Sequence, residues 1–478
     1  MDWFINYPKA KGEYLDRRFG TDLTIGSIPR HLLLFAVPML IGNFIQIGHS
    51  IINTIWVGHL VGEDAVGASG VSFPIFFILI GFAMGLTMAT MILVSHYYGA
   101  KDYGRVEKVV NNSFSLTLII GAILTIADIL SVDILLRLME TPPENFTMAS
   151  SYLKIMLLSF PLMYLGLLIS SILRGIGDTV TPLIFMSIGV TLNAILDPFL
   201  IGGFGPFPHL GLNGAAWATL ISQGTALSIG FVYLNRKNHL VAFNPKRLIL
   251  DRRITFLVFQ IGFPSIIQQS LVSLGAMFIT TFVNSFGSAA TNAFGAVGRV
   301  DMFVFMPAMS MSMAVSALTG QNLGASKPER VKDIFKWGVI MTLPITIFIS
   351  LIAVFLSKII LVLFGLGNDA AVMKIGMSYL RIVGSCYILL AVMFISNGIT
   401  NGSGHTMVTM IFSLMSLWGI RVPFSWLLSK TSLGITGIWV AIALSFLVMM
   451  IVSLAYYSSG RWKKSVILKT PTPISYGE

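Results

Sequence analysis

An acidic residue, Asp197, stands within a long apolar run of the chain, in the segment LNAILDP at positions 192–198. Asn193 precedes it by four residues, so in a helix the two side chains lie on one face, one turn apart. Pro198 has no backbone N–H, which leaves the carbonyl of Ala194 as another oxygen near the carboxylate. Small cations prefer oxygen ligands of this kind, and a charged side chain inside an apolar span defaults to a functional role. The sequence therefore predicts a site for a small cation, or for a proton carried by the carboxylate, at Asp197.

Three more charged residues lie in apolar runs of the second half of the chain. Arg299 and Asp301 share one run, and Arg421 lies in another, two residues before Pro423. Side chains two residues apart point to different faces of a helix, so Arg299 and Asp301 are not expected to pair with each other. Arg421 is one candidate partner for Asp301. Structural pairing within this half and contact with a substrate are both open, and we include all three residues in a predicted substrate cavity.

Methionines follow Asp301 in the segment MPAMSMSMAV, which begins at Met306. Met306, Met309 and Met313 are spaced by three and four residues, so they share one helix face. The flexible thioether side chain adapts to irregular shapes. We therefore predict that these three residues line the substrate cavity, with ordinary packing as the alternative.

Membrane helices are the elements that must position these residues. Of the 478 residues, 55% are hydrophobic and only 11% are charged, with a mean hydropathy of +0.83. Soluble domains carry roughly 45–50% apolar and about 25% charged residues, so most of the outer surface is expected to face lipid. Apolar runs that reach the about 20 residues of a spanning helix are centred near residues 45, 82, 122, 161, 190, 222, 268, 308, 348, 388, 417 and 446. The predicted fold class is an all-α integral membrane protein of about twelve spans.

The net charge of +11 would fit a nucleic-acid partner, but its distribution along the chain argues against one. If the N-terminus lies in the cytoplasm, 23 of the 31 Lys and Arg residues fall on the cytoplasmic side and six on the outer side. The positive-inside rule predicts this distribution. We therefore expect a multi-pass protein of the cell membrane, in contact with the lipid bilayer, with both termini cytoplasmic. The single cysteine, Cys386, allows neither a disulfide nor a CxxC site and is interpreted as a packing residue.

Four short matches recur along the chain at nearly one offset, which indicates an internal repeat. SHYYGAKDYGRV at 95–106 matches GQNLGASKPERV at 320–331, and RGIGDT at 174–179 matches NGSGHT at 401–406. Pro38 matches Pro264, and GLNGAAWATLIS at 211–222 matches GITGIWVAIALS at 434–445. The offset of about 225 residues spans six helices, an even number, so both copies have the same orientation in the membrane.

The repeat predicts two parallel six-helix lobes with a cavity between them, which is a known layout of transporters. The predicted segments are an N-terminal segment at 1–30, an N-terminal lobe at 31–235, a cytoplasmic connector at 236–253, a C-terminal lobe at 254–458 and a tail at 459–478.

Over essentially its whole length, the chain resembles the bacterial multidrug and toxic compound extrusion (MATE) transporters. The resemblance rests on GQNLGASKPERV after the eighth span and its degenerate copy after the second, on NxxxDP at 193–198, on the GxxGAAxAT stretch ending at Thr219, and on NTIWVGHLVG in the first span. It implies twelve helices in two bundles, a V-shaped central cavity, and export of amphipathic, often cationic, compounds in exchange for inward Na⁺ or H⁺. It implies no enzymatic activity and no cofactor beyond that coupling ion.

The resemblance also adds partners for Asp197. In relatives with a cation site in the N-terminal lobe, an Asp of the first helix, an Asn and an Asp of the fifth and a Thr of the sixth surround the cation. The last three match Asn193, Asp197 and Thr219, whereas the first matches Asn53, an amide that removes one negative charge and leaves Na⁺ or H⁺ open. His49 lies one turn before Asn53 on the same face and could titrate near neutral pH. A bond from His49 to a neighbouring helix is the alternative, and no further metal site is expected.

Three other classes of protein fit the sequence less well. A major facilitator transporter shares the two parallel halves, but GAKDYGRVEK at 99–108 lacks an Arg directly after Asp102 and a basic pair after Gly104. A lipid-linked oligosaccharide flippase shares the broad fold but would need several basic cavity residues for pyrophosphate. A membrane prenyltransferase needs clustered acids for magnesium, and no DDxxD-like string occurs. We therefore expect a monomeric antiporter for small-molecule drugs or metabolites.

Overall fold

The first half of the chain folds into six long helices. The computed structural model describes residues 20–205, 207–237, 241–243, 245–367, 369–464 and 467, so most of the predicted N-terminal segment and tail lies outside the described residues. The helices of this half are α1 (Ile28–Leu60), α2 (Glu63–Gly99), α3 (Tyr103–Leu138), α4 (Pro143–Gly175), α5 (Val180–Gly202) and α6 (Leu212–Arg236).

The second half contains the corresponding spans, two of which are interrupted. It comprises α7 (Arg252–Asn284), α8 (Ser288–Gly324), α9 (Pro328–Phe355), the short α10 (Ser357–Leu363), α11 (Ala370–Ser385), α12 (Tyr387–Gly402), α13 (Thr406–Ser413), a π-helical stretch (Leu414–Arg421), α14 (Val422–Ser429) and α15 (Ile435–Ser458). α11 and α12 form one span bent by 47°, and α13 to α14 run on as another. With the bent pair counted as one span, the described residues contain twelve, which confirms the predicted fold class.

The two halves repeat each other in helix length and in loop geometry. α1 and α7 each have 33 residues, and α2 and α8 each have 37. The turn after α2 places Lys101 at φ 59°, and the turn after α8 places Ser326 at φ 58°. A positive φ is uncommon for residues other than glycine, so its recurrence at equivalent positions shows that the backbone itself is duplicated.

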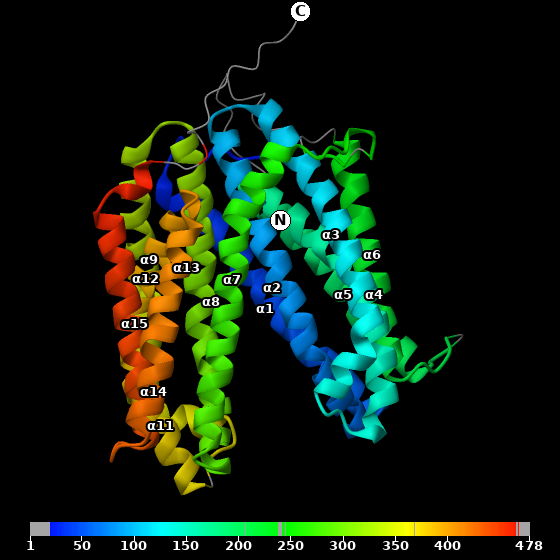
Figure 1. Ribbon diagram of the computed structural model, residues 1–478, viewed down its shortest axis with the longest axis vertical. Coiled ribbons are helices and arrows are strands. Elements are labelled where there is room, and N and C mark those ends of the chain that lie inside the picture. The colour runs from blue at the N-terminus through cyan, green and yellow to red at the C-terminus, as the bar shows by residue number, and fades with distance from the viewer. Residues whose placement is uncertain are drawn as a thin grey trace, which may run out of the picture.

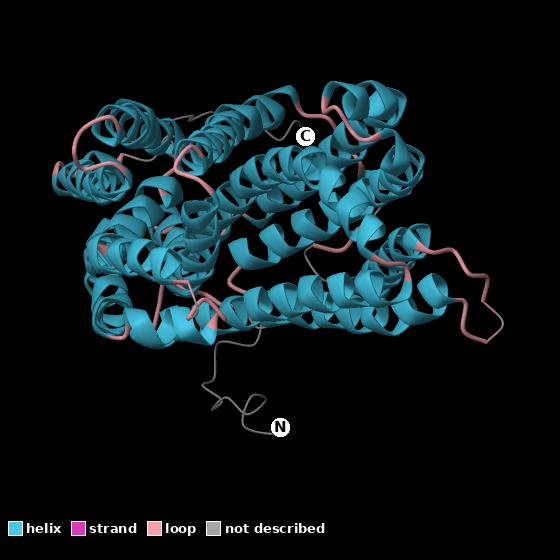
Figure 2. Ribbon diagram, turned by 90° about the horizontal axis from the view of Figure 1, so that it is seen from below, coloured by secondary structure: helices cyan, strands magenta, loops and turns pink. Residues whose placement is uncertain are grey.

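Lipid-facing side chains cover the outside of both lobes. Large apolar residues such as Leu130 of α3 and Phe355 of α9 are each 76% exposed. Each lobe has its own buried core, one centred on α2, α3 and α4 and the other on α8, α11, α12 and α15. Helices satisfy their own backbone hydrogen bonds, which is why they can carry apolar side chains into lipid. Figure 2 shows that most of the loops joining them are short.

The two lobes, α1–α6 and α7–α15, meet near one end of the molecule and diverge toward the other (Figure 1). The end of α6 and the start of α7 lie at the meeting end, which we call the connector side. α2 contacts α7 and α8 of the other lobe, and α1 contacts α8. Glycines permit this approach, because a Cβ on Gly85 would lie only 2.4 Å from a side-chain carbon of Ile266.

Candidate functional site

The residues predicted around Asp197 come together within the N-terminal lobe, where α1 and α6 pack against α5. α5 carries Asn193 and Asp197 one turn apart, with exposures of 2% and 0%. α1 contributes Asn53, whose Nδ2 donates to Oδ2 of Asp197 at 3.1 Å. One turn earlier on α1, Nε2 of His49 lies 2.5 Å from the side-chain amide of Asn193. Thr219 of α6 completes the group, so the structure places all five residues in one small volume.

The amide of Asn193 joins the three helices. With its nitrogen turned toward Asp197, it donates to Nε2 of His49 at 2.5 Å and to Oδ2 of Asp197 at 3.1 Å, and its oxygen accepts the backbone N–H of Thr219 at 3.0 Å. We adopt this orientation because it gives each of these polar atoms a suitable partner. An imidazole nitrogen accepts a hydrogen bond only when it carries no proton. In this orientation Nε2 of His49 is the acceptor, so the amide of Asn193 links the imidazole to the carboxylate.

One oxygen of the carboxylate has no partner. Oδ1 of Asp197 is buried and accepts no hydrogen bond, and none of the described Lys or Arg side chains pairs with this group. A buried polar group left unpaired costs about 1–3 kcal/mol, and more when it is charged. A proton would remove the charge of the carboxylate, and a small cation would give Oδ1 a partner, so either lowers that cost.

The donor set around Asp197 is poor in charge. The described part of the chain contains no group of three or more His, Cys, Asp or Glu residues that could hold a metal ion. A cation at this site would therefore meet one carboxylate together with neutral oxygens. Such a set suits an ion that binds and leaves, or a proton, better than a tightly held divalent metal.

Tyr152 of α4 is a neighbour of Asp197 that sequence reasoning missed. It is 9% exposed, on a helix that contacts both α5 and α6. The chain has 13 tyrosines, and nothing in the pattern around this one separates it from the others.

Asp301 lies inside the C-terminal lobe, where two tyrosines bind it. Tyr379 of α11 donates to Oδ2 at 2.6 Å, and Tyr387 at the start of α12 donates a short bond to Oδ1. The candidate partner Arg421 is not within ion-pair distance; its Nε instead donates to the hydroxyl of Ser445 at 2.8 Å. Both oxygens of this carboxylate are therefore satisfied by hydrogen bonds.

The two intramembrane arginines point to different places. Arg299 is exposed, and its guanidinium carbon lies 5.9 Å from the centre of the Phe364 ring. Arg421, at the end of the π-helical stretch, stacks 4.8 Å above the ring of Phe446. As the spacing predicts, Arg299 and Asp301 do not pair. Arg299, Asp301 and Arg421 each contact different side chains, so they do not form one side of a common cavity.

The predicted cavity methionines lie along α8. Met309 is exposed, whereas Met306 and Met313 are half-buried. Met313 packs against the core that α1 and α8 share, and Asn43 of α1 donates to Ser310 of α8 at 3.2 Å in the same contact. Met313 therefore has a packing role, while Met309 is free to meet lipid or a ligand.

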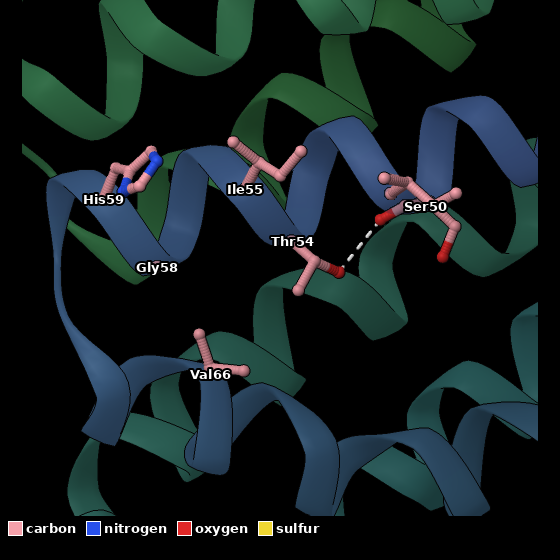
Figure 3. A pocket seen from close by; sticks show the side chains of 7 residues that line it. Ser50, Thr54, Ile55, Gly58, His59 and Val66 are labelled. Atoms are coloured by element: carbon pink, nitrogen blue, oxygen red, sulfur yellow. Dashed lines mark hydrogen bonds between the residues drawn. The ribbon is translucent and has the colours of Figure 1, made fainter. Parts of the chain in front are cut away.

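A pocket of about 460 Å³ lies against α1 (Figure 3). By their helical spacing, the residues of α1 that line it lie on the opposite face from His49 and Asn53. The residues that line it are Ser50, Ile51, Thr54, Ile55, Gly58, His59 and Val66. The Thr54 hydroxyl donates to the Ser50 carbonyl at 2.9 Å, so this polar group is already paired. None of the residues predicted for the substrate cavity lines this pocket. α1 thus carries part of the Asp197 site on one face and a mainly apolar pocket on the other.

Comparison with known proteins identifies relatives along nearly the whole chain. A model of the MatE family matches residues 38–199 and 264–427, once in each half, and the first match contains Asp197. The probable multidrug resistance protein YoeA of Bacillus subtilis is 33% identical over 449 residues, which cover 93% of this chain and 96% of that protein. The multidrug export protein MepA of Staphylococcus saprophyticus is 27% identical over 413 residues, covering 86% of this chain and 89% of that protein.

A solved structure shows the same fold. A MOP superfamily transporter from Pyrococcus furiosus superposes with a TM-score of 0.84 over 96% of this chain and 100% of that chain, at 24% identity. The resemblance inferred from the sequence motifs is confirmed. Because the family match begins at the equivalent prolines Pro38 and Pro264 and extends through both lobes, the chain belongs to the MatE family, whose members are multidrug efflux transporters and not enzymes.

Proposed function

We propose that the chain is a secondary active antiporter that exports amphipathic, often cationic, compounds in exchange for inward H⁺ or Na⁺, with Asp197 as the coupling residue. The observation that carries this proposal is the buried Oδ1 of Asp197, which has no hydrogen-bond partner in a lobe interior. Such an atom favours occupancy by a proton or a small cation. The multidrug resistance relatives support the substrate class.

α1 takes part in both the ion site and the pocket proposed for the exported compound, so it couples the two. His49 and Asn53 on one face bond the Asn193 and Asp197 side chains, while Ile51 and other residues on the opposite face line the apolar pocket. A ligand shifts a conformational equilibrium only by its difference in affinity for the two states. A cation at Asp197 and a compound beside α1 that prefer different positions of this helix would oppose each other, which is the requirement for exchange.

The distribution of charge orients the molecule in this proposal. Basic residues are concentrated on the connector side, so this side faces the cytoplasm of a cell-membrane protein. With this orientation both termini are cytoplasmic, as the charge distribution predicts, and the transporter acts as a monomer. The lobes diverge on the opposite side, from which exported compounds would leave (Figure 1).

The substitution Asp197→Asn tests the proposal, because an amide of the same shape neither ionises nor takes up the coupling ion. Efflux of a fluorescent cationic dye from cells should be lost while the amount of protein in the membrane is unchanged. In membrane vesicles, transport driven by an imposed Na⁺ or pH gradient should disappear, and the gradient that drives the unsubstituted protein identifies the ion. Asp301→Asn is the matched control in the other lobe and should keep the ion dependence. Normal efflux by the Asp197→Asn protein would overturn the assignment.

A further inference from the structure

α2 and α8 cross in backbone contact on the connector side. A Cβ on Gly99 of α2 would lie 2.0 Å from the carbonyl oxygen of Gln321, and a Cβ on Gly324 of α8 would lie 2.0 Å from the carbonyl oxygen of His96. Gly99 matches Gly324 in the repeat, and His96 matches Gln321. The crossing is therefore a two-fold contact in which each lobe presents the same surface to the other.

Two side chains at the crossing reach a turn of the opposite lobe. His96 of α2 bonds through Nε2 to the carbonyl of Gly402, which ends α12, at 2.8 Å. Gln321 of α8 donates through Nε2 to the carbonyl of Gly175, which ends α4, at 2.9 Å. Both side chains have an exposure of 0%. Gly175 and Gly402 stand at the same place in RGIGDT and NGSGHT, so the two bonds are equivalent by the repeat.

The segment 20–27, which precedes α1, also bonds the side chain of Gln321. The backbone N–H of Leu23 donates to Oε1 of Gln321 at 2.9 Å. The N–H of Thr21 donates to the carbonyl of Ile176 in the N-terminal lobe at 2.9 Å. Lys327 of the C-terminal lobe donates to the carbonyl of Thr24 at 3.0 Å. The segment therefore bridges both lobes, and the amide of Gln321 lies at the centre of the bridge.

We propose that His96 and Gln321 are positioning residues that hold the lobes together on the connector side, and that both bonds break whenever the transport pathway opens there. The proposal rests on the proposed function in one respect, because an alternating transporter has to open on each side in turn. Each broken bond leaves buried polar groups without partners, which favours the closed state. Since the bonds are related by the two-fold repeat, one rotation of the lobes stretches both at once.

Distances between spin labels test the proposal in the purified full chain. The labels are attached through Arg236→Cys at the end of α6 and Lys332→Cys on α9, both exposed, in a Cys386→Ser background. With His96 and Gln321 unchanged, the distance between the two labels should have one dominant, short value. Gln321→Leu and His96→Leu should each raise the population of the longer distance about tenfold, the effect expected from one buried hydrogen bond and its stranded partner, and the two changes together should raise it further.

A matched control and a surface variant separate this role from simple loss of stability. Gln268 donates to Ser413 at 2.8 Å, a bond between α7 and α13 of a single lobe, so Gln268→Leu should leave the distance unchanged. Lys327→Ala combined with Arg330→Ala removes a partly buried bond to Thr24 and an exposed bond to Gly26, both from the C-terminal lobe. This surface pair should lengthen the distance without loss of monodisperse protein.

The outcomes distinguish this proposal from that of ion coupling. If Gln321→Leu, His96→Leu and the surface pair all give the distance distribution of the Gln268→Leu control, the bonds do not hold the connector side closed. The label distances do not depend on the identity of any ion. Normal efflux by the Asp197→Asn protein would overturn the coupling residue and leave the result at the crossing unaffected.

Discussion

Replacing Asn53 by Asp would put a second carboxylate into the Asp197 site. Nδ2 of Asn53 lies 3.1 Å from Oδ2 of Asp197, so the new carboxylate would stand in direct contact with the first. Two unit charges about 4 Å apart interact by about 4 kcal/mol at an effective dielectric constant of about 20. A cation bound between the two carboxylates gains a second attraction of similar size, and it removes their mutual repulsion.

The expected consequence of Asn53→Asp is tighter binding of Na⁺. An energy of about 4 kcal/mol corresponds to about a thousandfold in affinity. Water that reaches the half-buried α1 side of the site screens the charges and lowers this gain. Calorimetric titration of the purified protein with NaCl, with KCl as comparison and at alkaline pH to limit competition from protons, measures the change directly. Thermal unfolding should also become dependent on Na⁺ concentration, since a ligand that binds only the folded state stabilises it.

Two further variants decide whether the gain comes from the pair of carboxylates. Asn43→Asp makes the same change on the same helix, at a residue that bonds Ser310 and not Asp197. Asn53→Leu removes the amide without adding charge. Equal Na⁺ affinity in Asn53→Asp and the unsubstituted protein, or an equal gain in Asn43→Asp, would refute the geometry inferred for the site.

Two other predictions concern the second lobe. Tyr379→Phe and Tyr387→Phe each remove one of the bonds to the buried Asp301 carboxylate. Each should lower the free energy of unfolding by about 1.5–3 kcal/mol, measured by thermal unfolding, and leave the ion dependence of efflux unchanged. An unchanged unfolding temperature would show that Asp301 does not need these bonds. Gly324→Ala would place a Cβ 2.0 Å from a carbonyl oxygen of α2, so the distance between the spin labels on the connector side should increase. Gly295 lies on the same helix with open space around it, so Gly295→Ala should give the distance of the unsubstituted protein.

The membrane spans could be predicted because lipid imposes a simple rule on composition and length. The bend between two of the helices could not, because the contact found at it is distant in sequence. The bend between α11 and α12 contains no proline; the hydroxyl of Ser350 donates instead to the carbonyl of Gly384 at 2.7 Å. A side chain that takes a backbone carbonyl is a known cause of helix kinks. The π-helical stretch ends two residues before Pro423, and within it Trp418 donates to the carbonyl of Leu271 on α7 at 3.2 Å, a contact that the sequence did not indicate.

The candidate site shows the same division between local and distant information. Asn193 and Asp197 could be grouped from the sequence alone, because a spacing of four residues places two side chains on one helix face. Asn53 and Thr219 were added only by the family resemblance, since residues on different helices have no fixed spacing. The tyrosines that bind Asp301 are 78 and 86 residues away from it, and no motif marked them.

The duplicated scaffold carries different charges at its centre. The fifth span of the first half, α5, holds Asp197, whereas the equivalent span of the second half holds Arg421 at the end of the π-helical stretch. Arg421 and Asp301 are opposite charges in the same lobe, and the acid has a hydrogen bond on each oxygen. Asp197 has no described basic partner and one oxygen without a bond. In the proposed antiport, a carboxylate without a basic partner becomes neutral by taking up a proton or Na⁺, whereas one that is held by two hydrogen bonds gains less from doing so. In the mechanism we propose, the repeat supplies two lobes that rotate against each other, and the coupling ion acts on the first of them, at the unpaired Oδ1 of Asp197.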